Sequence, residues 1–145
     1  MRLAVASMLC FALLAMLGCA NSLFDFTGKE SALEEAQGRY TELVRWGEIV
    51  GASAFVDPAI AANFLSTAER FQHIRFTEFE SGPLQFGEDS KTATVNVVYH
   101  AYSTRTFVER TFRERQEWYL EESVGNDWRV RPNLDAIENE LSGSH

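Results

Sequence analysis

The chain has 145 residues, of which 46% are hydrophobic and 23% are charged, and its formal net charge is −8. This acidic balance, without a cluster of Lys and Arg, argues against a nucleic-acid-binding surface and against electrostatic attachment to anionic lipid. The length suits a single domain with one hydrophobic core.

Both cysteines, Cys10 and Cys19, precede the region that is expected to fold. The folded body is therefore expected to hold no disulfide and no reactive thiolate. The chain also lacks the CxxC and HExxH spacings that are typical of zinc sites. No metal and no cofactor are predicted.

An apolar run of about 16 residues, LAVASMLCFALLAMLG, follows Arg2. One positive charge before a run of this length is typical of a signal peptide, because a membrane-spanning helix needs about 20 apolar residues. The alternative is a membrane anchor helix that stays uncut.

The run ends in Met16-Leu17-Gly18-Cys19, which resembles the lipobox of bacterial lipoproteins, with Met16 in place of the usual Leu. The resemblance implies that the signal peptide, residues 1–18, is cut off between Gly18 and Cys19. It also implies that Cys19 carries a diacylglyceryl group and that its new amino group is acylated with a fatty acid such as palmitate. Two or three chains anchor a protein durably, since each buried CH₂ contributes roughly 0.8 kcal/mol. Ala20 rather than Asp follows the cysteine, which by the same resemblance implies the outer membrane, facing the periplasm.

Residues 19–30 are expected to form a lipidated tether, residues 31–134 the folded domain and residues 135–145 a carboxy-terminal tail. Ser31 and Glu34 match a capping box, which predicts a helix that begins at Ser31. Apolar residues at helical spacing continue to an end near Gly47. Trp46 is expected in the core or at the mouth of a cavity.

Small residues over 48–55 predict a short second helix or turn. The pair Asp57-Pro58 predicts a further helix that ends near Glu69, with Asp57 as its N-cap and Pro58 in its first turn. The capping role accounts for Asp57 without a catalytic role.

The second half of the chain alternates β-branched and aromatic residues with polar ones, which predicts an antiparallel sheet of about four strands. The strands are expected at 71–80, 92–103, 107–122 and 128–131. The third is too long to lie flat in a small domain. A bulge or strong bend is therefore predicted at 113–116, where both faces turn polar.

Helices followed by a bent meander, together with the segment YTELVRWGEIVGASAFVDP, resemble the nuclear transport factor 2-like, or cone, fold and its small bacterial lipoproteins. The resemblance implies an α+β domain in which amino-terminal helices pack on a strongly bent antiparallel sheet and leave a conical pocket. Members include ketosteroid isomerases, dehydratases and non-enzymatic binding or assembly domains, so the fold does not decide the function.

Five residues are candidates for lining that pocket: Tyr40, His73, His100, Tyr102 and Trp118. They form no spacing that specifies a reaction, whereas an isomerase needs a carboxylate facing an oxyanion donor in an apolar pocket. The sequence therefore predicts no enzyme, but a membrane-anchored envelope lipoprotein that acts in binding or assembly. The alternatives are a protein that binds a small apolar ligand, or an isomerase or dehydratase.

The charged residues of the segment 109–117 are interpreted as a solvated outer face of the sheet, with a polar interface for a partner as the alternative. The expected partners are the membrane, through lipid on Cys19, and an envelope protein or a second copy of the chain. Nucleic acid is not expected.

Overall fold

The computed structural model describes residues 27–123, 125 and 127–133. The chain divides into two compact units, Met1–Leu33 and Glu34–His145. Residues 27–33 are the described part of the first unit, and they are helical. The predicted signal peptide, Cys19 and the tail at 135–145 lie outside the described residues. Within the described residues, no helix is both long enough and apolar enough to cross a membrane.

Five strands form one antiparallel sheet in the second unit. They are β1 (Ile74–Ser81), β2 (Gln85–Phe86), β3 (Thr92–Ser103), β4 (Glu109–Glu121) and β5 (Asp127–Arg131). The strand order is β1-β3-β4-β5, and the two-residue β2 pairs with β3 beside β1. The predicted α+β class with a meander of antiparallel strands is confirmed.

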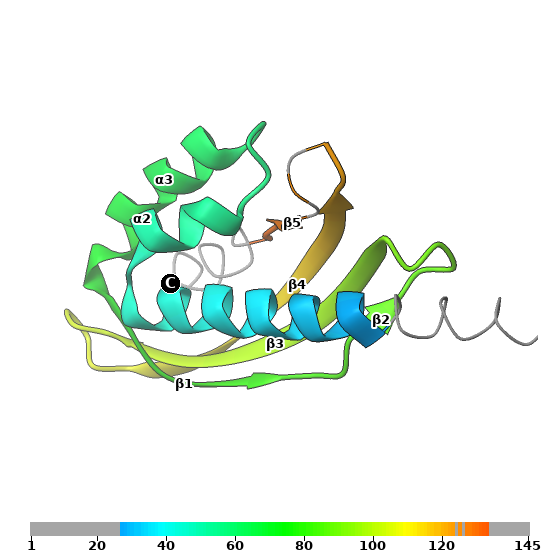
Figure 1. Ribbon diagram of the computed structural model, residues 1–145. Coiled ribbons are helices and arrows are strands. Elements are labelled where there is room, and N and C mark those ends of the chain that lie inside the picture. Colours follow the sequence, from blue (N-terminus) through cyan, green and yellow to red (C-terminus); the bar gives the residue numbers. More distant parts are fainter. Residues whose placement is uncertain (1–26, 124, 126, 134–145) are drawn as a thin grey trace, which may run out of the picture. The chain divides into compact units, whose positions relative to one another are not determined.

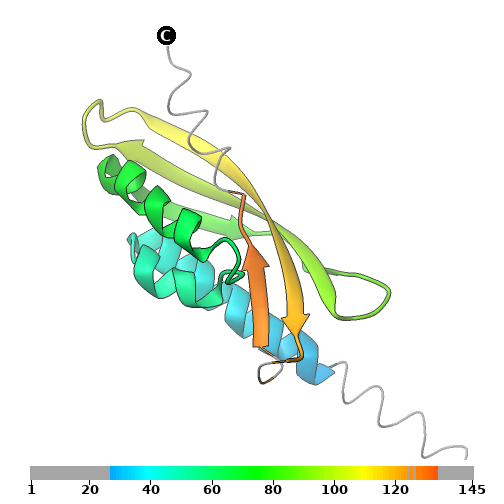
Figure 2. The same cartoon turned by 90° about the horizontal axis from the view of Figure 1, so that it is seen from above.

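Helices cover one face of this sheet (Figures 1 and 2). The sheet side of the core is built by alternation, since every second residue of a strand points to the same face. The buried residues on that face are Ala93, Val95, Val97, Tyr99 and Ala101 of β3, Phe112, Glu114, Gln116 and Trp118 of β4, and Trp128 and Val130 of β5. The buried residues Tyr40, Val44 and Phe64 come from the helices.

The amino-terminal helix covers 27–46 of the described chain, so it is already helical four residues before the predicted start. Ser31 and Glu34 are exposed residues inside this helix and do not cap it. The helix extends past Ser31 toward the amino terminus because no residue between 27 and 31 breaks it. Gly28 lowers helix stability by only about 1 kcal/mol relative to alanine. The predicted end is confirmed: Gly47 has φ 73°, and the N–H of Glu48 bonds to the carbonyl of Leu43 at 2.8 Å.

The short helix α2 (Ile49–Ala52) and a 3₁₀ turn (Ser53–Phe55) occupy the segment where a second helix or turn is predicted. Helix α3 spans Ala61–Arg70, later than expected. Asp57 caps the preceding turn rather than the helix, because its Oδ1 accepts the N–H of Ala59 at 2.9 Å. Its Oδ2 accepts Nε of Arg131 at 2.8 Å, which ties this turn to β5.

The predicted bulge at 113–116 is wrong. The pairing of β3 with β4 runs without a shift from Thr92↔Tyr119 to Tyr102↔Glu109. The polar residues Glu114 and Gln116 keep the alternation and point into the core, so no extra residue is needed. The sheet instead has its irregularity in β1, between Phe76 and Glu78, and its long strands curve along their length beneath the helices (Figure 1).

Three smaller expectations also change. His73 lies in a 3₁₀ turn (Phe71–His73) before β1 and not in the first strand. The strand predicted at 107–122 is β4 and begins at Glu109, because Phe107 has φ 56° and lies in the preceding turn. Trp46 is 65% exposed, and its indole N–H donates to Glu42, so it is not a core residue.

Candidate functional site

A group of hydrogen-bonded polar side chains lies buried between the sheet and the amino-terminal helix. This Glu114 cluster consists of Gln37, Tyr40 and Thr41 from the helix, Tyr99 from β3, and Glu114 and Gln116 from β4. The strand period of two turns both β4 residues inward, and the helical spacing of three and four puts the helix residues on one face. All six residues are buried, and Glu114 is only 1% exposed.

Both oxygens of the Glu114 carboxyl group accept hydrogen bonds. Oε2 accepts the Tyr99 hydroxyl at 3.0 Å and Nε2 of Gln116 at 2.9 Å. Oε1 accepts the Tyr40 hydroxyl at 3.4 Å, and the backbone N–H of Asn133 adds a further bond to the carboxyl group. The bond from Tyr40 is the longest of the three side-chain bonds and so the easiest to exchange.

Gln116 fixes the orientation of the cluster. Its Oε1 accepts the indole N–H of Trp118 at 3.2 Å, and an indole can only donate. The amide is therefore oriented with Nε2 toward Glu114. Gln37 donates to Thr41 at 3.0 Å and to Ser81 at 3.0 Å, which continues the network from the core to the end of β1.

Burial dominates the electrostatics of the cluster. Removal from water raises the pKa of the Glu114 carboxyl group, although the hydrogen bonds from Gln116, Tyr99 and Tyr40 oppose the shift. Burial, followed by the charge of Glu114, also raises the pKa values of Tyr40 and Tyr99 well above their ordinary value. Both tyrosines therefore remain neutral donors over the physiological pH range.

Aromatic rings surround the cluster on the covered face of the sheet. Tyr40 meets Trp118 edge-on, with ring centroids 5.8 Å apart, and lies 6.2 Å from Phe64. The ring of Tyr99 lies 5.3 Å from that of Phe76 and 6.3 Å from that of Phe79. Apolar surroundings of this kind strengthen each hydrogen bond to a developing charge.

The arrangement supplies the parts that acid–base chemistry needs. A carboxyl group whose pKa is raised towards neutrality is a better general base than an ordinary glutamate. A tyrosine hydroxyl beside it can donate to an oxygen that gains negative charge. Among the described residues, every fully buried polar side-chain atom has a partner, so a substrate oxygen would have to exchange with one of the present bonds.

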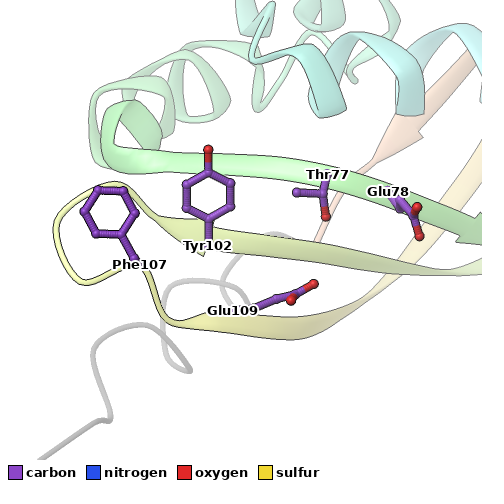
Figure 3. A pocket seen from close by; sticks show the side chains of 5 residues that line it. All are labelled: Thr77, Glu78, Tyr102, Phe107 and Glu109. Atoms are coloured by element: carbon purple, nitrogen blue, oxygen red, sulfur yellow. The ribbon is translucent and has the colours of Figure 1, made fainter.

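The structure separates the five candidate pocket residues. It places Tyr40 in the Glu114 cluster and Trp118 against Gln116. His100 and Tyr102 point to the opposite face of the sheet, where His100 contacts Thr111 and Tyr102 lines an open groove (Figure 3). His73 contacts Arg105 near the start of β1.

Sequence reasoning missed Glu114, Gln116 and Tyr99 as site residues. Glu114 and Gln116 sit in a densely charged run, which favours a solvated face. The signal was their register: they alternate with exposed residues and are in phase with Phe112 and Trp118. A buried strand face with a carboxylate in it is uncommon and is often functional.

No group of three or more His, Cys, Asp and Glu side chains in the described ranges is arranged to hold a metal ion. Cys19, the predicted lipidation site, is not among these residues, and its role stays a prediction.

No family model matches the chain, and no curated protein matches it either. Solved structures do match. A proposed isomerase from Bacillus subtilis has 12% identity and a TM-score of 0.55, covering 80% of this chain and 96% of its own. A proposed polyketide cyclase from Xanthomonas campestris pv. campestris has 12% identity and a TM-score of 0.53, and the match covers 74% of this chain and 94% of the cyclase. A ketosteroid isomerase-like protein from Erwinia carotovora atroseptica has 16% identity and a TM-score of 0.50, and the match covers 69% of this chain and 88% of that protein.

The chain has the nuclear transport factor 2-like cone fold. The expected fold resemblance is thereby confirmed, whereas identities of this size leave the reaction open.

The prediction that the chain is not an enzyme is contradicted. It rested on the lack of a convergent acid–base set, and Glu114, Tyr40 and Tyr99 form such a set. The solved structures with this fold are named as isomerases and a polyketide cyclase, which also speaks against the prediction of a non-enzyme.

Proposed function

We propose that the chain is an isomerase-type enzyme that moves a proton on a small, largely apolar carbonyl compound. The observation that carries this proposal is the buried Glu114 carboxyl group, which has a raised pKa and accepts bonds from two tyrosine hydroxyls. The names of the fold neighbours from Bacillus subtilis and Erwinia carotovora atroseptica support the same reaction class.

Each residue of the cluster has a distinct role in the proposed reaction. Glu114, in its ionised form, takes a proton from the carbon next to the carbonyl group. The C–H bond breaks, an O–H bond forms on Glu114, and the electron pair moves onto the carbonyl oxygen. Glu114 then returns the proton to a carbon further along the conjugated system, which restores the carboxylate.

Tyr40 is the donor to the substrate oxygen. Its bond to Glu114 is the longest of the three side-chain bonds, at 3.4 Å, so this is the bond that the substrate carbonyl replaces. Tyr99 and Gln116, at 3.0 Å and 2.9 Å, hold the carboxylate in place during the exchange. The substrate is expected to be apolar, because aromatic rings surround the cluster.

A simple assay tests the proposal. The full chain in mild detergent is incubated with 3-cyclohexen-1-one and larger β,γ-unsaturated ketones, and conjugation of the double bond is followed by ultraviolet absorbance. Glu114→Gln is expected to lower kcat/KM by about 10²–10⁴-fold, because the base is lost. Tyr40→Phe is expected to lower it by about 10²–10³-fold, because the enolate oxygen loses a donor.

Glu117→Gln is the matched control. It makes the same chemical change on the same strand, but Glu117 lies exposed on the other face, 3.8 Å from Arg115. Its activity should equal that of the wild type. Absence of turnover across the ketone panel, or an equal effect of the two Glu→Gln changes, would contradict the proposed function.

The lipid anchor is a second part of the proposal and rests on the lipobox alone. Cys19 would carry the lipid and hold the enzyme at the bacterial outer membrane, facing the periplasm. The intact mass of the mature protein tests this: it should begin at Cys19 and carry two or three acyl chains. A mass that retains residues 1–18, or an unmodified Cys19, would contradict it.

A further inference from the structure

An open groove lies on the face of the sheet opposite to the Glu114 cluster (Figure 3). Its volume is about 480 Å³, within the range of ligand sites. The lining residues are Thr77 and Glu78 of β1, Tyr102 of β3, Phe107 of the β3–β4 turn and Glu109 of β4. None of them belongs to the proposed isomerase site, so the groove is independent of that function.

Two aromatic rings form one side of the groove. Phe107 is 78% exposed, and its ring is nearly parallel to that of Tyr102, at 17° and with centroids 6.4 Å apart. The neighbouring Val108 is 50% exposed. Large apolar side chains that protrude together from a turn are typical of a surface that contacts another molecule.

Two carboxylates, those of Glu78 and Glu109, line the other part of the groove (Figure 3). Within the described ranges, the side chains of Glu78 and Glu109 make no hydrogen bond and no ion pair. The shift of register between Phe76 and Glu78 gives β1 its two consecutive groove residues, Thr77 and Glu78.

Two arginines lie near the groove, and neither pairs with its carboxylates among the described residues. Arg75, opposite Tyr102 in the register, donates to the carbonyl groups of Gln72 and Ile74. Arg110 lies one residue out of phase with Glu109 and so points to the other face of β4. The groove therefore combines two aromatic rings with two carboxylates that form no ion pair within the described residues.

We propose that this groove binds an arginine side chain presented by a basic segment of a partner protein. A guanidinium group is planar, stacks on aromatic faces and pairs with carboxylates, so it matches both features of the groove. The groove is open and Phe107 protrudes, which suits a side chain held in place by a second protein surface. A free small cation would stay largely in water there.

Fluorescence anisotropy tests the proposal with two dye-labelled pentapeptides and the full chain in detergent micelles, at about 0.15 M salt. One peptide has a central arginine between two leucines, and the other has citrulline in place of the arginine. Citrulline has the same shape as arginine without the charge, so the citrulline peptide should bind about tenfold more weakly than the arginine peptide. The affinity for the arginine peptide should fall about fivefold in Phe107→Ala. It should fall by the same factor in the double variant with Glu78→Gln and Glu109→Gln.

Glu80→Gln is the matched control, since Glu80 lies exposed on the same strand and face outside the groove. It should leave the affinity unchanged, and all variants should keep the wild-type melting temperature because the altered side chains are on the surface. The proposal is overturned by equal affinity for the two peptides, by no binding of either peptide, or by an equal loss in Glu80→Gln. It is also overturned if benzyltrimethylammonium binds the groove more tightly than the arginine peptide does, because the site would then serve free organic cations.

Discussion

At the scale of single residues, Glu114 is the unusual feature of the chain. It is one of several acidic residues in the segment 109–117, yet it alone among them is buried. Burial of a carboxylate is costly, and proteins retain such groups when they are hydrogen-bonded and useful. Four donors around the Glu114 carboxyl group reduce that cost without cancelling it, since its pKa remains raised.

The raised pKa predicts how stability depends on pH. The folded state favours the protonated form of Glu114 more than the unfolded state does. The stabilisation from Glu114 is therefore complete below the unfolded pKa of about 4.3 and is lost as the pH rises through the folded pKa. Relative to Glu114→Gln, which does not titrate, wild-type stability should fall over this window in urea unfolding. Glu117→Gln should keep the wild-type dependence, and a difference that stays constant or grows with pH would contradict the assignment.

At the scale of elements, the sequence was a good guide where one face is apolar. The bounds of β3 and the faces of its residues were predicted, because Val95, Val97 and Tyr99 alternate with polar residues without a break. The end of the amino-terminal helix was predicted for a similar reason: Gly47 is the local signal for a left-handed residue.

Other features depend on partners that the sequence does not place. The inward direction of Glu114 requires Tyr40 and Tyr99, which lie 74 and 15 residues away along the chain. The bulge was expected because the strand is long and both of its faces turn polar at 113–116. It is absent because Glu114 and Gln116 point into the core and keep the alternation unbroken. The separation of Tyr102 and His100 from Tyr40 likewise follows from the faces of the assembled sheet.

Gly38, inside the amino-terminal helix, and Gly47, just past its end, give an element-scale prediction with its own control. Gly47→Ala should destabilise the protein by about 1 kcal/mol, because Gly47 ends the helix at φ 73°. Gly38→Ala should stabilise it by about 0.5–1 kcal/mol, because Gly38 lies inside the helix with no atom near its would-be Cβ. Urea unfolding measures both, and equal effects of the two changes would contradict this account of the helix end.

At the scale of the whole molecule, the proposed functions fall on separate surfaces and segments. The Glu114 cluster lies on the covered face of the sheet and the arginine groove on the outer face. The lipobox adds a proposed membrane anchor ahead of the folded domain. A net charge of −8 gives the protein little attraction to anionic lipid, so the anchor would have to act through its acyl chains.

The two cysteines test the anchor. Cys19→Ser should abolish incorporation of labelled palmitate and leave the protein unprocessed, because the lipidated sulfur and the cleavage site are lost. Cys10→Ser is the control, since Cys10 lies in the part that is expected to be removed. It should leave labelling and membrane fractionation as in the wild type. Equal labelling of the Cys19→Ser protein would exclude this anchor.

The central claim is that a buried carboxyl group with a raised pKa performs the chemistry, and carbon-13 NMR of the glutamate carboxyl groups measures it most directly. A resonance that disappears in Glu114→Gln and persists in Glu117→Gln should titrate above the ordinary glutamate range. The pH–rate profile on the unsaturated ketone should rise with the same apparent pKa, because the carboxylate is the base. A Glu114 resonance that titrates at or below the ordinary value, or a rate that does not follow it, would contradict the account.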